Sequence, residues 1–328
     1  PAWVIDHIDQ DVPMLIEQIR TRVLPKRGIV AAPDEILITL GSQNALYLLT
    51  RLLLSSTTRI GVENPCFREA INTFLLADAE VVPHPVDEEG IVLNERPCDY
   101  YYVTPGHQVP TGVTMSSARR RQLLEHAARH DAVIIEDDYD SESNFTLNPL
   151  PALKASDRSG RVVYASSLSK ALSPGLRLGF MVADPDLIDE ARALRRLVYR
   201  HPPTNIQYQM AHFLAQGHYE THLRRYHYDS AQRWERLHAA LQRYLPSCRA
   251  LAGSEHANAF WLQTPAQINT QQLTWRAAHA GVLIEPGARH FLNAAPPDNY
   301  FRMGFHAINP DAIAQGVEVL RGQLEQMG

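Results

Sequence analysis

The chain has 328 residues, 45% of them hydrophobic and 20% charged, and its formal net charge is −5 at pH 7. This length favours two domains over one small core, and the negative charge argues against nucleic-acid binding by this chain alone. No apolar stretch approaches the ~20 residues of a membrane span, and no signal peptide opens the chain. The three cysteines, Cys66, Cys98 and Cys248, lack a CxxC spacing, which argues against a zinc site or a disulfide framework and favours a cytoplasmic protein.

Short apolar runs rich in β-forming residues alternate with helical patterns from Ile36 onward. Such alternation is typical of a mostly parallel sheet with helices on both faces. Seven strands are predicted, at Ile36–Leu40, Arg59–Glu63, Glu80–Pro83, Tyr100–Val103, Ala132–Glu136, Val162–Ala165 and Leu178–Val182. The helices among them are predicted at Asn44–Leu54, Arg68–Leu76, Ser116–Arg129 and Asp186–Tyr199.

The pattern changes after about residue 205. A long helical pattern extends from His218 to Tyr244, and three short strands are predicted near Ala259–Leu262, Val282–Glu285 and Tyr300–Phe305, before a closing helix at Pro310–Leu324. We therefore predict a large domain at residues 29–204 and a small C-terminal α+β domain at residues 205–328. Residues 1–28, with a helical pattern around Met14–Val23, are expected to pack on the small domain.

One apolar strand pattern is followed by a turn that contains two hydroxyl side chains and a lysine, and an arginine lies seven residues after the lysine. These residues are Ser167, Ser169, Lys170 and Arg177. An amine at the end of a buried strand can form a Schiff base with an aldehyde, and hydroxyls and a guanidinium are the groups that a phosphate dianion needs. Most lysines are solvated surface groups, so this interpretation requires agreement from the rest of the chain.

A second strand pattern, beginning at Ala132, ends in the acidic sequence Glu-Asp-Asp-Tyr-Asp-Ser-Glu. Ligands bind outside the carboxyl ends of buried parallel strands, so Asp137 and Tyr139 are candidate ligand contacts. A calcium loop would need a glycine at its sixth position, and a nucleotide site would need a phosphate loop of the GxxxxGK[ST] type. The sequence has neither.

Together these segments resemble the fold-type I aminotransferases, which use pyridoxal 5′-phosphate and whose large domain carries a seven-stranded, mostly parallel sheet. The resemblance implies that Lys170 binds the cofactor covalently and moves the substrate proton. It implies that Asp137 keeps the pyridine nitrogen protonated and that Tyr139 contacts the 3-oxygen of the ring. Ser167, Ser169 and Arg177 would hold the phosphate.

A glycine turn after the first predicted strand leads into Ser42 and Gln43 at the start of a helix. Backbone N–H groups at a helix N-terminus bind phosphate, although Ser42 is equally an ordinary N-cap. By resemblance, Ser42 and Gln43 complete the phosphate site. Phe67 is expected to lie over the pyridine ring, with a core phenylalanine as the alternative.

The segment from His107 to Gly112 departs from ordinary aminotransferases, which carry asparagine directly before Pro-Thr-Gly, where this chain has Val109. The second contact to the ring oxygen therefore stays open. The pattern His-Gln-x-Pro-x-Gly, followed by Met-Ser and later by Glu-Asp-Asp-Tyr-Asp-Ser-Glu, is similar to the aminotransferase-like domain of MocR/GabR regulators. The resemblance extends from about Leu24 to the C-terminus.

In the last predicted strand, Arg302 lies on the face opposite Phe301 and Met303. By resemblance it anchors the substrate α-carboxylate through two hydrogen bonds, and a surface arginine on an edge strand is the alternative. His126 and His130 have metal-ligand spacing on a predicted helix, but no third ligand is evident. They are interpreted as surface residues, and no metal site is predicted.

The resemblance implies amino-group transfer from an amino acid to the cofactor and on to a 2-oxo acid. It equally implies an alternative, in which the chain is the effector-sensing and dimerisation domain of a MocR/GabR-type transcriptional regulator. In that case the DNA contact lies in a winged-helix domain ahead of Pro1, and a start without methionine is compatible with a piece of a longer protein. A homodimer is expected, because family active sites lie at a subunit interface.

Overall fold

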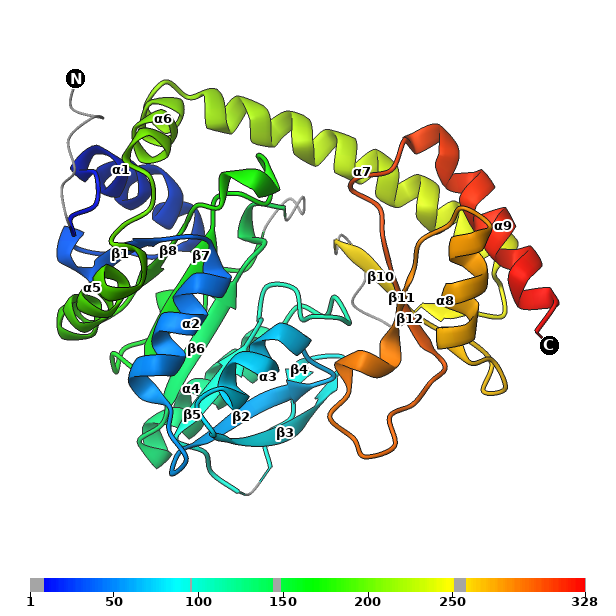
Figure 1. Cartoon of the computed structure of the whole chain (residues 1–328), viewed down its shortest axis with the longest axis horizontal. Coiled ribbons are helices and arrows are strands. Elements are labelled where there is room, and N and C mark those ends of the chain that lie inside the picture. Colours follow the sequence, from blue (N-terminus) through cyan, green and yellow to red (C-terminus); the bar gives the residue numbers. More distant parts are fainter. Residues whose placement is uncertain (1–8, 95, 144–148, 251–257, 328) are drawn as a thin grey trace.

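The computed structural model describes residues 9–94, 96–143, 149–250 and 258–327. Its larger sheet has eight strands in the order β1-β8-β7-β6-β5-β2-β3-β4 (Figure 1). The strands are β1 (Ile36–Thr39), β2 (Arg59–Asn64), β3 (Glu80–Asp87), β4 (Gly90–Ile91), β5 (Tyr100–Val103), β6 (Val133–Asp138), β7 (Val162–Ser167) and β8 (Gly179–Val182). All seven predicted strands form, and the two-residue β4 adds an eighth by pairing with the end of β3.

Five neighbouring strands, β7, β6, β5, β2 and β3, run parallel, whereas β8 is antiparallel to both β7 and β1. Parallel strands need crossover connections, which the predicted helices supply. Such connections contain α2 (Ser42–Leu53), α3 (Arg68–Leu75) and α4 (Ser117–His130), whereas α5 (Pro185–Tyr199) follows β8, the last strand of this sheet along the chain. Side chains of α2, α3 and α5 share one core with the sheet, and Leu123 of α4 belongs to the core on the other face.

The N-terminal segment packs differently from the prediction. Its helical turns are α1 (Pro13–Gln18), a π-helix at Ile19–Val23 and a 3-10 helix at Leu24–Arg27. Their apolar side chains share a core with β1, β8 and α6 (Thr204–Ala215), and the backbone N–H of Val12 donates to Gln207 of α6 over 2.9 Å. The segment thus packs on the large sheet, because α6 covers that sheet although it follows the predicted domain boundary.

The smaller sheet has the antiparallel order β11-β12-β10-β9. Its strands are β9 (Arg249–Ala250), β10 (Ala259–Gln263), β11 (Glu285–Pro286) and β12 (Tyr300–Gly304). It shares a core with α7 (His218–Tyr244), α8 (Thr270–His279) and α9 (Ile313–Glu325). Short 3-10 helices lie at Pro33–Glu35, Ser141–Ser143, Lys154–Ser156, Pro174–Leu176, Gly287–His290 and Pro310–Ala312.

Helix α7 joins the two parts of the molecule (Figure 1). Its early residue Leu223 lies in the core of the large sheet, and its later residues Leu237 and Leu241 lie in the core of the small sheet. The division between the two cores therefore falls within α7 rather than at residue 205. Among the described residues, no helix is both long and apolar enough to cross a membrane.

Candidate active site

A cavity of about 460 Å³ lies where the carboxyl ends of the parallel strands meet the small sheet. The large sheet contributes residues at or shortly after the carboxyl ends of β1, β2, β5, β6 and β7, and the small sheet contributes Glu285 and Arg302. Every site residue predicted from the sequence lines this cavity, namely Ser42, Gln43, Phe67, Asp137, Tyr139, Ser167, Ser169, Lys170, Arg177 and Arg302. Residues far apart in the sequence are thus brought to one place.

Asp137 lies near the end of β6 and is buried, with 5% of its surface exposed. Its Oδ2 accepts a hydrogen bond of 2.9 Å from the hydroxyl of Tyr102 on the neighbouring strand β5. Its Oδ1 has no hydrogen-bond partner among the described residues. Burial raises the pKa of Asp137 to about 6, although the nearby hydroxyls of Tyr102 and Ser42 oppose this shift. A buried carboxylate with one free oxygen can accept a hydrogen bond from a ligand that carries a proton.

Lys170 follows β7 and is reachable from the cavity. Its Nζ lies 3.8 Å from the centre of the Tyr139 ring. Although the side chain is open to the cavity, desolvation by the surrounding protein lowers the pKa of Lys170 to about 8. The Asp140 and Asp137 carboxylates oppose this shift, and the Arg302 guanidinium adds to it. A larger fraction of this amine is therefore unprotonated, and hence nucleophilic, at neutral pH than for an ordinary lysine.

The shifted pKa makes a prediction that needs no cofactor. Acetic anhydride modifies only unprotonated amines, so labelling of Lys170 should rise through a midpoint near pH 8. An ordinary lysine titrates near ~10.4. The chain has only two other lysines, Lys26 and Lys154, so mass spectrometry of three peptides measures the acetylation of every lysine side chain. A midpoint for Lys170 near that of an ordinary lysine would contradict the shift.

Gly41, Ser42 and Gln43 form the turn into α2 on the cavity wall, beside Arg177. Gly41 has a φ of 85°, and a Cβ at this position would lie 3.4 Å from Arg177 Nη2. A side chain here would therefore strain the backbone and crowd the guanidinium. Arg177 Nη2 donates to the carbonyl oxygen of Leu40 over 3.2 Å, which holds the guanidinium at the start of the helix.

Ser169 has a different role from Ser167 in this turn. Its hydroxyl donates to the carbonyl oxygen of Leu178 over 3.0 Å and accepts from the Leu178 N–H over 2.7 Å. A hydroxyl has one proton to donate, and that of Ser169 is used within the protein. Ser169 therefore stabilises the turn between β7 and β8 and has no proton left to donate to a ligand. The donors facing the cavity here are therefore Ser42, Ser167, Arg177 and the start of α2.

Val109, at the position where ordinary aminotransferases carry asparagine, makes part of the cavity wall apolar. Val109 lines the cavity, as does Phe67, which directly precedes α3. The neighbouring Gln108 does not replace the missing asparagine, because its side-chain nitrogen donates to the carbonyl oxygens of Pro65 and Val109, each over 2.7 Å. Its Oε1 accepts from the N–H and the hydroxyl of Thr111.

Arg302 lies on β12 directly opposite Glu285 of β11. Because β12 lies between β11 and β10, Arg302 is not on an edge strand. Its Nη1 is 3.5 Å from Glu285 Oε2, and Oε1 of the same carboxylate is 3.3 Å from His290 Nε2 and 3.5 Å from Arg289 Nη1. Contact with His290 lowers the pKa of Glu285, and the two guanidinium groups act in the same direction.

Sequence patterns missed several lining residues. Tyr102 belongs to a predicted strand, and its position beside the strand of Asp137 could have indicated it. Glu285 ends a predicted strand and could have been found by pairing that strand with the one that carries Arg302. Nothing in the local pattern indicates Arg289 and His290, which lie in a 3-10 helix.

The two histidines of α4 lie away from this cavity. His126 Nε2 is 2.8 Å from the hydroxyl of Tyr101, and the rings of His126 and His130 have centres 4.5 Å apart. His126 is therefore a hydrogen-bonded residue rather than a free surface one. In the part of the chain that the structure describes, no group of three or more His, Cys, Asp or Glu side chains is placed to hold a metal ion.

Comparison with known proteins agrees with this geometry. The family described as "Aminotransferase class I and II" matches residues 9–318. The HTH-type transcriptional regulator TauR of Rhodobacter capsulatus is 38% identical over 316 residues, which are 95% of this chain and 65% of the regulator. The probable rhizopine catabolism regulatory protein MocR of Rhizobium meliloti is 33% identical over 323 residues, which are 97% of this chain and 64% of that protein.

Among solved structures, the kynurenine aminotransferase of Pyrococcus horikoshii, in complex with PMP, superimposes with a TM-score of 0.89 at 27% identity. The superposition covers 97% of this chain and 81% of that chain. The described chain thus has the fold-type I architecture and spans a little less than two thirds of the two regulators. It belongs to the class I and II aminotransferase family and is similar to the aminotransferase-like part of MocR-type regulators.

Proposed function

We propose that this chain binds pyridoxal 5′-phosphate and transfers an amino group between an amino acid and a 2-oxo acid. The observation that carries the proposal is the pairing of Lys170, an amine of lowered pKa, with the buried carboxylate of Asp137 across one cavity. Residues with shifted pKa values in a cavity indicate a functional site. Family membership and the enzyme with a similar fold support the same activity.

The residues present fit this cofactor. The free Oδ1 of buried Asp137 suits a protonated ring nitrogen, and the apolar wall of Phe67 and Val109 suits a flat heterocycle. Arg177, Ser42, Ser167 and the start of α2 suit a phosphate dianion. When bound, the ring accepts electrons from the bond that breaks at the substrate α-carbon.

The protein groups have separate tasks in this proposal. Lys170 Nζ holds the cofactor and, once free, moves a proton at the substrate α-carbon. Asp137 would hold the ring nitrogen protonated, and Tyr139 would contact the ring oxygen, for which its hydroxyl must exchange its hydrogen bond to the carbonyl oxygen of His107. Arg302 anchors the substrate carboxylate, for which it must exchange its contact with Glu285. Gln43 and Ser169 support the phosphate end through the backbone of their turns.

A second candidate function rests on the two regulators. Their sequences extend well beyond the region that matches this chain, so the same site supports ligand sensing in a longer transcription regulator. Any DNA contact would then belong to another domain, and the sequence encoded ahead of Pro1 decides whether one is present.

One experiment separates the two functions. The chain loaded with pyridoxal phosphate is incubated with a panel of amino acids, first alone and then with a 2-oxo acid, and absorbance and product 2-oxo acids are recorded. Amino-group transfer predicts release of the oxo acid derived from the amino acid, and turnover when the second substrate is present. A spectral response without oxo-acid release supports the sensor. Absence of any response from a loaded chain contradicts both.

A homodimer is the expected assembly, on the resemblance to family enzymes with sites at a subunit interface. Exposed apolar side chains such as Leu197 and Val198, with 83% and 52% of their surface accessible at the end of α5, are consistent with a covered surface. Sedimentation of the loaded chain should show about twice the mass of the 36.9-kDa polypeptide. A stable, cofactor-loaded monomer contradicts this expectation.

A further inference from the structure

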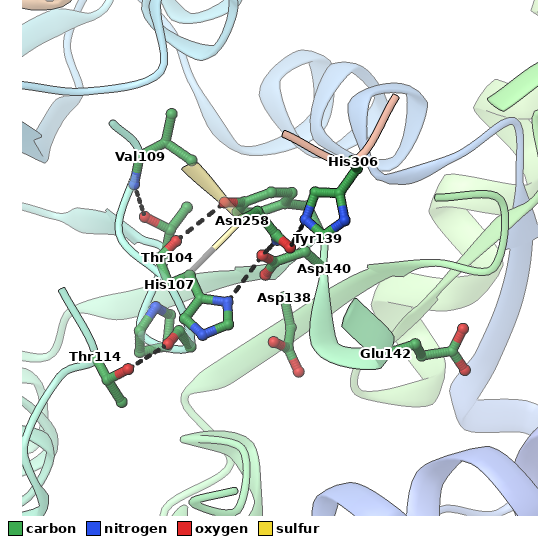
Figure 2. Close-up of polar contacts among 12 residues, drawn as sticks. Thr104, His107, Val109, Thr114, Asp138, Tyr139, Asp140, Glu142, Asn258 and His306 are labelled. Atoms are coloured by element: carbon green, nitrogen blue, oxygen red, sulfur yellow. Dashed lines mark hydrogen bonds and ion pairs between the residues drawn. The ribbon is translucent and has the colours of Figure 1, made fainter. Parts of the chain in front are cut away.

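Buried polar side chains that do not line the cavity form a hydrogen-bonded network (Figure 2). Asp140 Oδ2 accepts a hydrogen bond of 2.9 Å from His107 Nδ1 and a second one from the side-chain amide of Asn258. Asn258 Oδ1 lies 2.8 Å from His306 Nε2. Asp140, His107 and Asn258 expose 2%, 3% and 5% of their surface, so water does not compete for these hydrogen bonds.

The direction of each hydrogen bond in the network follows from its chemistry. The Asn258 nitrogen donates to a carboxylate, so its oxygen must accept, and His306 Nε2 must carry a proton. The hydroxyls of Tyr226 and Ser230 lie 3.1 Å and 3.2 Å from His306 Nδ1, whose single lone pair accepts a hydrogen bond from this side. Burial lowers the pKa of His306 to about 4, so the ring is neutral at physiological pH. The direction of each hydrogen bond from Asp140 to His306 is therefore fixed.

The network joins elements that are distant in the sequence. His107 and Asp140 follow β5 and β6 of the large sheet, whereas Asn258 directly precedes β10 and His306 follows β12 of the small sheet. His306 comes four residues after Arg302, the candidate carboxylate anchor. The strand that would hold the ligand carboxylate is thus connected by hydrogen bonds to Asp140.

Asp140 is also one of the charged groups around Lys170. Four groups face the lysine: Asp140 and Asp137 favour its charged form, Arg302 disfavours it, and the Tyr139 ring lies against Nζ. Of the two carboxylates, Asp140 has the larger effect on the lysine. Although burial opposes it, contact with His107 lowers the pKa of Asp140, so this carboxylate is charged.

We propose that Asn258 and His306 are positioning residues, which fix the place of the Asp140 carboxylate and thereby its effect on Lys170. The strand that carries Arg302 is connected to the reacting amine through them. Neither residue lines the cavity, so neither touches the substrate. Their effect on Lys170 passes through Asp140. The link to catalysis rests on the proposed function, but the link between the three residues and Lys170 does not.

The test is the pH midpoint of Lys170 acetylation in the full, cofactor-free chain. Asp140→Asn removes the carboxylate and should lower the midpoint by roughly 1 pH unit, the size expected for loss of a nearby opposite charge. Asn258→Ala should lower it by a smaller amount, because Asp140 then keeps only His107 as a donor. In the Asp140→Asn background, Asn258→Ala should have no further effect, since coupled residues are not additive.

His306 supplies a matched pair of variants that separates hydrogen bonding from packing. His306→Phe keeps a ring against Tyr226, whose plane lies 8° from that of His306, but removes the contacts with Asn258, Tyr226 and Ser230. His306→Gln keeps a donor for Asn258. The midpoint should fall with phenylalanine and stay near the wild-type value with glutamine, in proteins whose circular dichroism and Tm show them to be folded.

Additive shifts from Asn258→Ala and Asp140→Asn would overturn the proposal, as would an unchanged midpoint in folded Asn258→Ala or His306→Phe. These results are independent of whether the chain is an aminotransferase. A chain that shows the coupling but never attaches pyridoxal phosphate supports the network and refutes the proposed function. Attachment of pyridoxal phosphate at Lys170 without the coupling supports the proposed function and refutes the network.

Discussion

Replacement of Lys170 by alanine is expected to abolish covalent attachment of pyridoxal phosphate completely. The chain offers only three lysines, and Lys170 alone lines the cavity. Borohydride reduction of the loaded wild type should fix the cofactor on the peptide that contains Lys170, as detected by mass spectrometry. The variant should still bind the cofactor reversibly, because Asp137 and Arg177 are unchanged, and dialysis should then remove it.

Lys26→Ala is the matched control for this prediction. Lys26 lies near Glu220, 3.5 Å from its carboxylate, and does not line the cavity. Its replacement should leave the yield of reduced, labelled protein unchanged. Label on Lys26 or Lys154 of the wild type, or persistent covalent attachment in Lys170→Ala, would show that the site has been assigned to the wrong amine.

Replacement of Arg302 by alanine is expected to weaken amino-acid binding at least about tenfold, since ~1.4 kcal/mol corresponds to tenfold in affinity. A charge-assisted hydrogen bond to the carboxylate contributes roughly 1.5–3 kcal/mol, and the guanidinium offers two. Cofactor binding should survive, because the proposed contacts lie on the large sheet. Titration of the loaded protein with amino acids, followed by absorbance, measures the change directly.

Glu285→Gln is the complementary variant, because it acts on the same guanidinium in the opposite direction. If Arg302 anchors the substrate, a ligand carboxylate would compete with Glu285 for its guanidinium. Removing that charge should strengthen amino-acid binding by a few-fold, a modest gain because these groups are partly exposed to solvent. Equal responses of the wild type and Arg302→Ala would remove Arg302 from the site, and weaker binding by Glu285→Gln would refute the competition.

Much of the fold could be predicted from the sequence. Seven of the eight strands of the large sheet and its four covering helices appear within a few residues of their predicted bounds, because both depend on local periodicity of apolar residues. Candidate contacts such as Lys170 and Asp137 follow from the rule that ligands bind at the carboxyl ends of buried parallel strands. That rule needs only the position of each strand end, which the sequence supplies.

Only the tertiary structure revealed how distant side chains meet. The contact of Arg302 with Glu285 depends on the pairing of β11 with β12, and the bonds of Asp140 to His107 and Asn258 join three separate strand ends. The packing of the N-terminal segment against α6 was likewise missed. Periodicity reports which face of an element is apolar, but not which partner covers it, because that choice depends on packing across the whole chain.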